Sequence, residues 1–295
     1  MEESVVASIV LPIGVAIIMA SLGLSLTLED FRRIFLYPRG IAIGIGNLLV
    51  ISPLLAFGTA ELFGLEAGLA VGLVLLGASP GGAMANMLTH LARGDTALSI
   101  TMTAISSVAA VITVPLFLGL ATERFGSGLD TDIEMAPIVA RVFLITVVPL
   151  GLAMAARRRW PEWVEANHEQ VRRISLGIFV AIVIGAVATE HDTVLDNLAE
   201  VAAATIALNL AAMTISFTVA KAAKLDDRQA TAIAMELGIH NASLAIAVGA
   251  SVATVLAIPA AVYSSFMFVS AGLFARLMYK RNGEAEPVAA TAAAS

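Results

Sequence analysis

The stretch Pro80-Gly81-Gly82-Ala83-Met84-Ala85-Asn86 interrupts one hydrophobic segment, and Glu236-Leu237-Gly238-Ile239-His240-Asn241 interrupts another. Each places helix-breaking or polar residues within a run that is otherwise apolar enough to span a bilayer. Lipid offers no partner to free backbone groups, so such a break persists only inside protein or beside a wet cavity. A pair of broken segments, one in each half of a chain, points to the binding site of a transporter.

The composition indicates a polytopic membrane protein. Of the 295 residues, 59% are hydrophobic and only 14% are charged, and the mean hydropathy is +0.90. Soluble domains carry about 25% charged residues. The absence of cysteine excludes disulfides and thiolate metal sites, and the net charge of −6 gives no indication of a nucleic-acid partner.

The sequence contains nine segments that are long and apolar enough to cross a membrane: 5–26, 38–62, 67–92, 95–121, 135–156, 172–190, 195–220, 229–252 and 255–279. The broken helices are 67–92 and 229–252. Residues 282–295 are rich in Ala and Glu and are predicted to form a disordered cytoplasmic tail. We therefore expect an all-α polytopic fold with nine transmembrane helices.

Positive charge gathers on one side of this arrangement. The loops after the odd-numbered segments hold 15 of the 17 Lys and Arg residues: Arg32, Arg33, Arg39, Arg93, Arg157, Arg158, Arg159, Arg172, Arg173, Lys221, Lys224, Arg228, Arg276, Lys280 and Arg281. The positive-inside rule then predicts a protein of the cell membrane with its N-terminus outside and its C-terminus in the cytoplasm. The clean alternation supports the count of nine, because a miscounted segment would mix the two sides.

The order of segments indicates an internal repeat. The link 126–134 separates a first block, 1–125, with four segments from a second block, 126–281, with five. The broken segment is the last but one in both blocks, so two repeats of the same order, one lacking its first helix, explain the pattern. The offset puts the two halves in opposite orientations, as in inverted-repeat transporters.

Glu236 is the most informative single residue. A carboxylate near the centre of an apolar segment costs about 3 kcal/mol even on the lenient insertion scale. It therefore requires a cation, a proton or a basic partner, and segment 229–252 contains no Lys or Arg. The alternative interpretation is a protonated Glu236 that hydrogen-bonds a neighbouring helix.

Oxygen-bearing residues accompany the first break. Asn86, Ser99 and Thr103 supply oxygen atoms of the kind that hard cations prefer. The break at Pro80-Gly81-Gly82 ends one half-helix and begins another, which exposes free carbonyls and free amides. The carbonyl end attracts a cation and the amide end attracts an anion.

Two further residues have two interpretations each. His240 either couples to protons, because imidazole titrates near pH 6.5, or acts as a neutral substitute for an amide side chain. Arg141 either extends to the outer membrane interface or contacts an anionic substrate. The sequence shows no nucleophile–base or metal-ligand spacing, so we expect no enzyme activity.

At these motifs the chain resembles the bile acid:sodium symporter family. The matching stretches are LEDFRR (28–33), GASPGGAMANMLTHLARGDTALSITMT (77–103) and MELGIHNASLA (235–245). The resemblance implies two inverted repeats forming a core domain and a panel domain, with two discontinuous helices crossing in the core. The chain is similar to the nine-helix form of the family, which agrees with the charge pattern.

The resemblance also implies sites. Its sodium ligands fall on Asn86, Ser99, Thr103, Glu236, Leu237, Ile239 and His240. This chain departs from the family pattern at Ala85, which replaces a Ser, and at His240 and Leu48, which replace Gln residues. The predicted substrate contacts are Pro80, Gly81, Gly82, Asn241, Ser243 and Arg141.

The function expected from these features is sodium-coupled symport of a small organic anion by alternating access, without a cofactor. The expected partners are the anion, sodium ions and membrane lipid, and the expected state is a monomer. Two alternatives remain: a proton-coupled organic-anion transporter, and a membrane sensor that binds a ligand without coupled flux.

Overall fold

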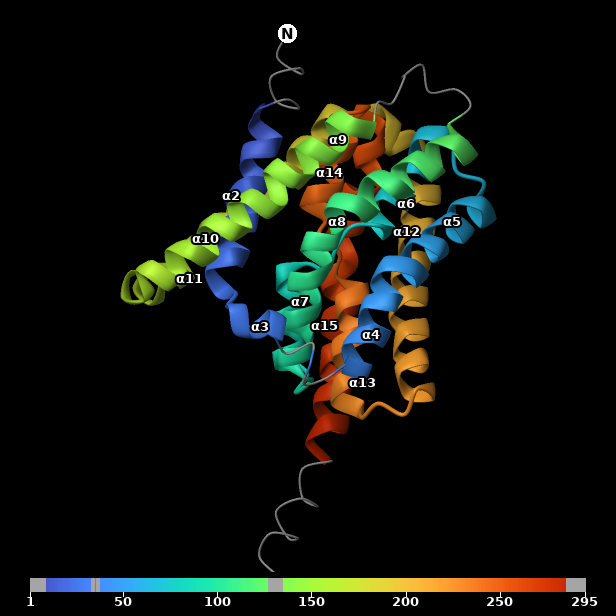
Figure 1. The fold of residues 1–295 in the computed structure, drawn as a ribbon. Coiled ribbons are helices and arrows are strands. Elements are labelled where there is room, and N and C mark those ends of the chain that lie inside the picture. Colours follow the sequence, from blue (N-terminus) through green and yellow to red (C-terminus); the bar gives the residue numbers. More distant parts are fainter. Residues whose placement is uncertain (1–8, 33–34, 36–37, 127–134, 285–295) are drawn as a thin grey trace, which may run out of the picture.

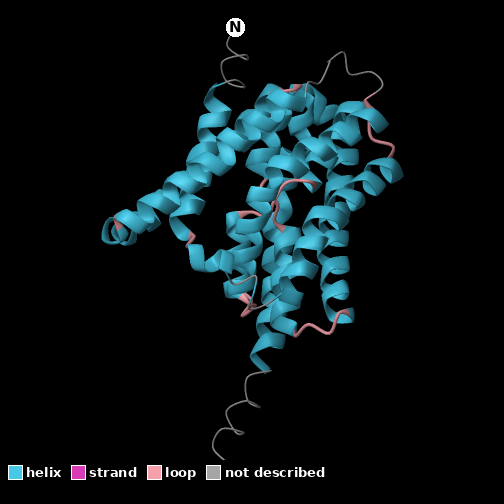
Figure 2. Cartoon of the chain, in the orientation of Figure 1, coloured by secondary structure: helices cyan, strands magenta, loops and turns pink. Residues whose placement is uncertain are grey.

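The computed structural model describes residues 9–32, 35, 38–126 and 135–284, and over these residues the chain forms helices connected by short loops (Figure 2). The elements are α2 (Leu11–Ser25), α3 (Leu28–Arg32), α4 (Pro38–Gly46), η3 (Asn47–Ile51), α5 (Ser52–Phe63), α6 (Ala67–Gly77), α7 (Ala83–Leu91), α8 (Thr96–Phe125), α9 (Met135–Val142), η4 (Phe143–Val147), α10 (Val148–Arg159), α11 (Pro161–Thr189), α12 (His191–Ala222), α13 (Asp227–Gly238), α14 (Ala242–Ala250), η5 (Thr254–Ala257) and α15 (Ile258–Glu284).

Within the described part of the chain, six helices are long and apolar enough to cross a membrane: Pro38–Phe63, Thr96–Phe125, Ala136–Arg159, Pro161–Thr189, His191–Ala222 and Thr254–Gly283. The other three predicted segments correspond to the 15-residue helix α2 and to the pairs α6–α7 and α13–α14. Both predicted breaks are therefore present. The division into two blocks depends on the link 126–134, which lies outside the described residues except for Gly126.

The region between residues 156 and 172 is helix, not the loop that the sequence suggested. Helix α10 ends at Arg159 and α11 begins at Pro161, so Trp160 alone connects them. Proline is well suited to the first turn of a helix, and Glu169 forms ion pairs with Arg172 and Arg173 at helical spacing. The first half of α11 is polar, so apolar length alone does not identify it as part of a long helix.

Two π-helical turns bend segments that were expected to be regular helices. The turn Asn47–Ile51 precedes Pro53, and the turn Phe143–Val147 precedes Pro149. A proline ring collides with the carbonyl four residues earlier and supplies no N–H, so the local widening of the helix accommodates it.

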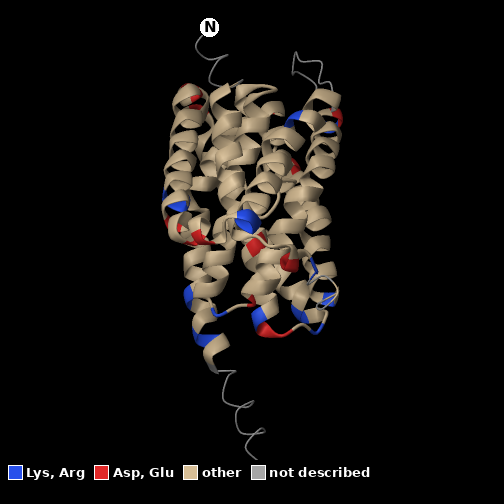
Figure 3. Cartoon of the chain, turned by 60° about the vertical axis from the view of Figure 1, so that its left-hand side comes forward, with Lys and Arg blue, Asp and Glu red and all other residues tan. Residues whose placement is uncertain are grey.

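The helices form two groups in space. Helices α2, α10 and α11 pack against one another along one flank, at the left of Figure 1, and the remaining long helices pack around α13 and α15. The two groups meet where α11 contacts α14 and α15, and where α2 contacts α14. Figure 3 shows most Lys and Arg in the lower half of the view, and Figure 1 shows that α15 ends there.

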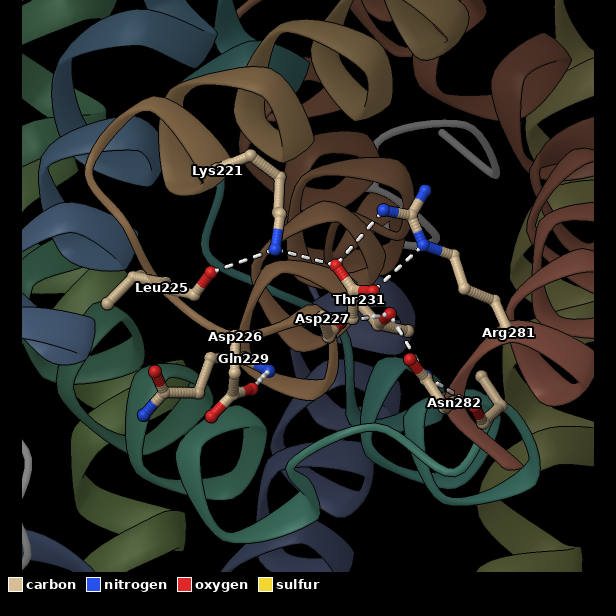
Figure 4. A network of polar contacts seen from close by, with 9 residues as sticks. Lys221, Leu225, Asp226, Asp227, Gln229, Thr231, Arg281 and Asn282 are labelled. Atoms are coloured by element: carbon tan, nitrogen blue, oxygen red, sulfur yellow. Dashed lines mark hydrogen bonds and ion pairs between the residues drawn. The ribbon is translucent and has the colours of Figure 1, made fainter. Parts of the chain in front are cut away.

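Helix α15 continues to Glu284, so the tail predicted to start at residue 282 begins later. The amide of Asn282 is buried and donates to Ala92 O at 2.9 Å and to Thr231 Oγ1 at 3.2 Å. These bonds attach the end of α15 to the end of α7 and to α13 (Figure 4). The rest of the predicted tail, residues 285–295, lies outside the described residues.

Asp227 is the charged centre of the same contact (Figure 4). Lys221 Nζ lies 2.7 Å from its Oδ1, and Arg281 Nε lies 2.9 Å from its Oδ2. The hydrogen bond from Lys221, helped by the one from Arg281, outweighs partial burial and holds the pKa of Asp227 below its usual value of 3.8. The ion pairs therefore join the start of α13 to the end of α12 and to the end of α15.

Candidate ion and substrate site

The two breaks lie against each other and are joined by backbone hydrogen bonds. Gly82 N donates to Ile239 O at 2.7 Å, and Asn241 N donates to Pro80 O at 2.8 Å. Backbone groups that leave a helix inside an apolar environment must find other partners. The crossing provides them, which explains why both breaks are stable at this depth.

Side chains from three other helices satisfy the carbonyls at the half-helix ends. The Gly238 carbonyl accepts hydrogen bonds from Asn209 Nδ2 and from Tyr263 Oη, both at 2.8 Å. The Gly77 carbonyl accepts one from Ser52 Oγ at 2.8 Å. Helices α5, α12 and α15 thereby hold the two C-terminal half-helix ends in place.

Glu236 lies at the crossing and is fully buried. Its Oε1 accepts hydrogen bonds from Ser99 Oγ at 2.6 Å and from Thr103 Oγ1 at 2.8 Å. The same two hydroxyls lie 2.8 and 3.2 Å from Asn86 Oδ1. Four of the predicted sodium ligands, from α7, α8 and α13, thus form one closed group of oxygen atoms.

The second carboxylate oxygen of Glu236 has no hydrogen-bond partner among the described residues. A side chain at Gly81 would collide with this Oε2, so the glycine leaves room for the carboxylate. An unpartnered buried carboxylate oxygen is costly and requires a proton or a cation. The donor set around it is oxygen only, which suits a hard cation, and the described residues contain no His, Cys, Asp and Glu cluster for a transition metal.

His240 has partners for both ring nitrogens. Its Nδ1 lies 3.1 Å from Ser79 O and its Nε2 lies 3.1 Å from Ser52 Oγ. A carbonyl oxygen can only accept, so the contact with Ser79 O assigns a proton to Nδ1. Nε2 of the neutral ring then accepts, and Ser52 shares its single hydroxyl hydrogen between Nε2 and Gly77 O. The ring therefore bridges the first break and α5. Leu237 and Ile239, the other residues predicted for a second cation, are also buried at this crossing.

A cavity of about 90 Å³ adjoins the crossing on the side of α2 and α11. One wall consists of the first residues of two half-helices: Gly82, Ala83 and Met84 before and within α7, and Asn241, Ala242 and Ser243 before and within α14. Free N–H groups and the helix dipole make such starts favourable for anions. The cavity therefore combines two anion-attracting helix starts with the buried Glu236 group on the far side of the crossing.

Asn241 has hydrogen-bonding capacity left for a ligand in this cavity. Its Oδ1 accepts from Ser243 Oγ at 2.8 Å and from Leu244 N at 3.2 Å. The partner of its Nδ2 is the Met19 sulfur at 3.6 Å, which is a weak acceptor. The amide N–H groups are therefore free for a stronger acceptor.

The predicted substrate residues divide into two sets. Gly82, Asn241 and Ser243 line the cavity, whereas Pro80 and Gly81 are buried in the crossing behind it. Arg141 is half-buried on α9 and is not among the residues that line the cavity. The structure thus separates Arg141 from the residues with which the sequence had grouped it.

Two cavity residues escaped the sequence analysis. The charge pattern counts Arg172 with the loop after segment 135–156, and apolar length gives Ser175 no role. Arg172, Ser175 and Phe179 all line the cavity. Their spacing of three and seven residues places them on one helix face, and that periodicity was the available signal.

An all-helical membrane protein in which two broken helices meet at a buried carboxylate belongs to the class of secondary transporters. The sequence model of the Sodium Bile acid symporter family matches residues 12–197. The chain therefore belongs to this family of membrane transporters, and it is not an enzyme.

Three of the similar curated proteins are named as sodium-dependent transporters or cotransporters. The uncharacterized sodium-dependent transporter YocS of Bacillus subtilis is 30% identical over 270 residues, which cover 91% of this chain and 83% of that protein. The probable sodium/metabolite cotransporter BASS2 of rice is 25% identical over 79% of this chain and 54% of its own length. The ileal sodium/bile acid cotransporter of the rabbit is 32% identical over 54% of this chain and 46% of its own length. The matches to the last two thus span about half of each relative.

Proposed function

We propose that the protein is a sodium-coupled symporter that carries a small organic anion across the cell membrane by alternating access. The observation that supports this most directly is the buried Glu236 carboxylate, which has one oxygen in a group of neutral oxygen donors and the other without a partner. A monovalent cation at this carboxylate would neutralise the buried charge. The names of the sodium-dependent relatives favour sodium as that cation.

The anion is proposed to occupy the cavity on the other side of the crossing. The same two breaks that border the cation group also supply the helix starts that line the cavity. A cation bound at Glu236 would therefore stabilise the arrangement of Gly82 and Asn241 on which the anion depends. Such a shared element gives each ligand a higher affinity when the other is bound.

The proposed transport cycle moves two groups of helices against each other. Helices α2, α9, α10 and α11 would form a panel, and the remaining helices would form a core that contains the crossing. Because the cavity lies between α2 and α11 on one side and the helix breaks on the other, sliding or rocking of the two groups would open it to each membrane face in turn. The proposed topology has nine spans in two inverted repeats, with an outside N-terminus.

Reconstituted vesicles test the proposal. We expect an inward sodium gradient to drive uptake of radiolabelled pyruvate, lactate or ketoisovalerate at constant pH, and replacement of sodium by choline to abolish it. Counterflow of the same compounds distinguishes a transporter from a sensor that binds without flux. Binding without counterflow for every compound that binds would contradict the transport proposal.

Proton coupling is the second candidate, and the position of His240 is the observation that favours it. The imidazole bridges Ser79 and Ser52 at the same crossing that contains the unpartnered Glu236 oxygen. In this case uptake would follow a pH gradient in choline medium. Uptake that is equal in sodium and in choline at every imposed pH gradient would favour protons over sodium.

A further inference from the structure

The cavity has a charged residue on the wall opposite the helix breaks. Arg172 of α11 lines the cavity, and among its lining residues it is the only Lys, Arg, Asp or Glu in the described part of the chain. Its guanidinium Nη1 lies 3.6 Å from the Met87 sulfur on α7. A thioether is a weak acceptor, so this side of the guanidinium remains available for a stronger one.

Ser175 adds a second polar group one turn further along α11. Its side chain lines the same cavity and is 6% exposed. Its hydroxyl is buried and has no hydrogen-bond partner among the described residues. A buried hydroxyl without a partner is less stable than a paired one, so this group favours a ligand with a polar atom beside it.

Apart from Ser21 on α2, the remaining wall residues on α2, α11 and α15 are apolar. They include Ile18, Leu176, Phe179, Met267 and Phe268. The polar groups are therefore Arg172, Ser175 and Ser21 on one side, and His240, Asn241 and the half-helix starts on the other. A ligand that satisfies both sides bridges α11 and the crossing.

We infer that Arg172 and Ser175 recognise the charged end of the transported anion, and that the substrate is a compact monocarboxylate with a polar atom next to the carboxylate and a short apolar body. The inference rests on the proposed function and deepens it. One guanidinium matches one carboxylate in charge and in bidentate geometry. The apolar remainder of the ligand faces the apolar wall, and the adjacent keto or hydroxyl oxygen faces Ser175.

Glu169 serves as the internal counter-ion of Arg172. Its Oε2 lies 3.0 Å from Arg172 Nη2, and both side chains are about half exposed. An exposed pair of this kind stabilises a protein only weakly, so a ligand carboxylate in the more enclosed cavity can displace it. Glu169 therefore competes with the substrate for Arg172.

The test measures ligand-induced changes in the melting temperature of the purified full-length protein. We expect pyruvate, lactate or ketoisovalerate to raise the apparent melting temperature in sodium, and the neutral amides pyruvamide and lactamide to have no such effect. Arg172→Gln should weaken the affinity for the active acid by about 10- to 100-fold, as expected for a charge-assisted bidentate contact. Arg172→Lys should retain part of the affinity, because it keeps the charge but loses the fork.

Arg173→Gln is the matched control. Arg173 carries the same charge, lies on the same helix and also pairs with Glu169, at 3.2 Å, but it does not line the cavity. Its substitution should change the affinity by less than about twofold. Glu169→Gln should strengthen carboxylate binding several-fold, because it removes the competing anion, whereas a purely structural role for the ion pair predicts the opposite sign.

Defined results would overturn the inference. Equal responses to an acid and its amide, or an Arg172→Gln variant with wild-type affinity, would remove Arg172 from recognition, and a lack of response to all three acids would refute the substrate class. The sodium response provides the separate readout. If sodium stabilises the protein through Glu236 but the response to the acids does not depend on Arg172, the proposed function stands and this inference is rejected.

Discussion

Gly81 and Glu236 are in such close contact that a β-carbon at position 81 would overlap the carboxylate oxygen Oε2 of Glu236. The absence of a side chain on the first break thus sets the position of the carboxylate on the second. The two broken segments are coupled at this point through space, in addition to the backbone bonds of Gly82 and Asn241.

Gly81→Ala should therefore displace the Glu236 carboxylate and weaken sodium activation. Overpacking of a tight site costs about 1–3 kcal/mol, which corresponds to roughly a 5- to 150-fold loss of apparent sodium affinity. The measurement is uptake as a function of sodium concentration. Gly58→Ala is the control, since an added β-carbon there meets no atom within 4 Å. If the Gly81→Ala variant shows the sodium activation of the wild type, the observed position of the Glu236 carboxylate is not required for sodium binding.

Glu236→Gln should abolish sodium-dependent uptake while the protein still inserts into the membrane. The amide keeps the size of the side chain but removes the negative charge that a cation would neutralise. Uptake assays and size-exclusion profiles of the purified variant check the two parts of this prediction. A variant that transports at the wild-type rate in sodium would refute the assignment of Glu236.

Asn86→Ala and Thr103→Ala should each lower the apparent sodium affinity with little effect on protein yield. Each removes one oxygen of the group around Glu236 Oε1. A lost contact of about 1 kcal/mol corresponds to roughly fivefold in affinity. Thr113→Ala is the matched control, because its hydroxyl bonds the Ala109 carbonyl within α8. Sodium activation curves that superimpose on the wild type would make the two residues structural.

Sodium stoichiometry should be below two ions per turnover. A second cation would need ligands near His240, but both ring nitrogens already have protein partners, and Leu48 is apolar. We expect a Hill coefficient for sodium of about 1, because a site without strong oxygen ligands cannot desolvate a hard cation. A coefficient clearly near two, with matching charge movement, would show that the second site is intact. A pH dependence of uptake that disappears in His240→Gln would instead favour proton coupling.

Asp227→Asn should destabilise the contact between α13 and the end of α15. The partners of Asp227 are partly exposed, so the loss is about 1 kcal/mol, or about 2 °C in melting temperature. Because the pKa of Asp227 is lowered in the folded protein, its contribution is complete above about pH 3.8 and disappears as the pH falls through the lower folded-state value. The variant and the wild type should therefore differ in melting temperature at neutral pH and converge in acid, with exposed Asp196→Asn as the control.

Much of the architecture followed from local sequence properties. Apolar length and charge predicted a helical membrane protein, and Pro80, Gly81 and Gly82 located one break because they disfavour helix wherever they occur. The oxygen group of Asn86, Ser99, Thr103 and Glu236 was also predicted, through family resemblance and side-chain chemistry, and the structure brings these four residues together.

Only the tertiary structure decided which groups face one another. It paired Gly82 with Ile239, gave His240 its partners on α5 and the first break, and placed Arg172 on the cavity wall instead of Arg141. These relationships depend on how each helix is rotated and where it crosses its neighbours. Helix rotation and crossing result from side-chain packing between segments distant in sequence, and for that reason hydropathy and local motifs did not reveal them.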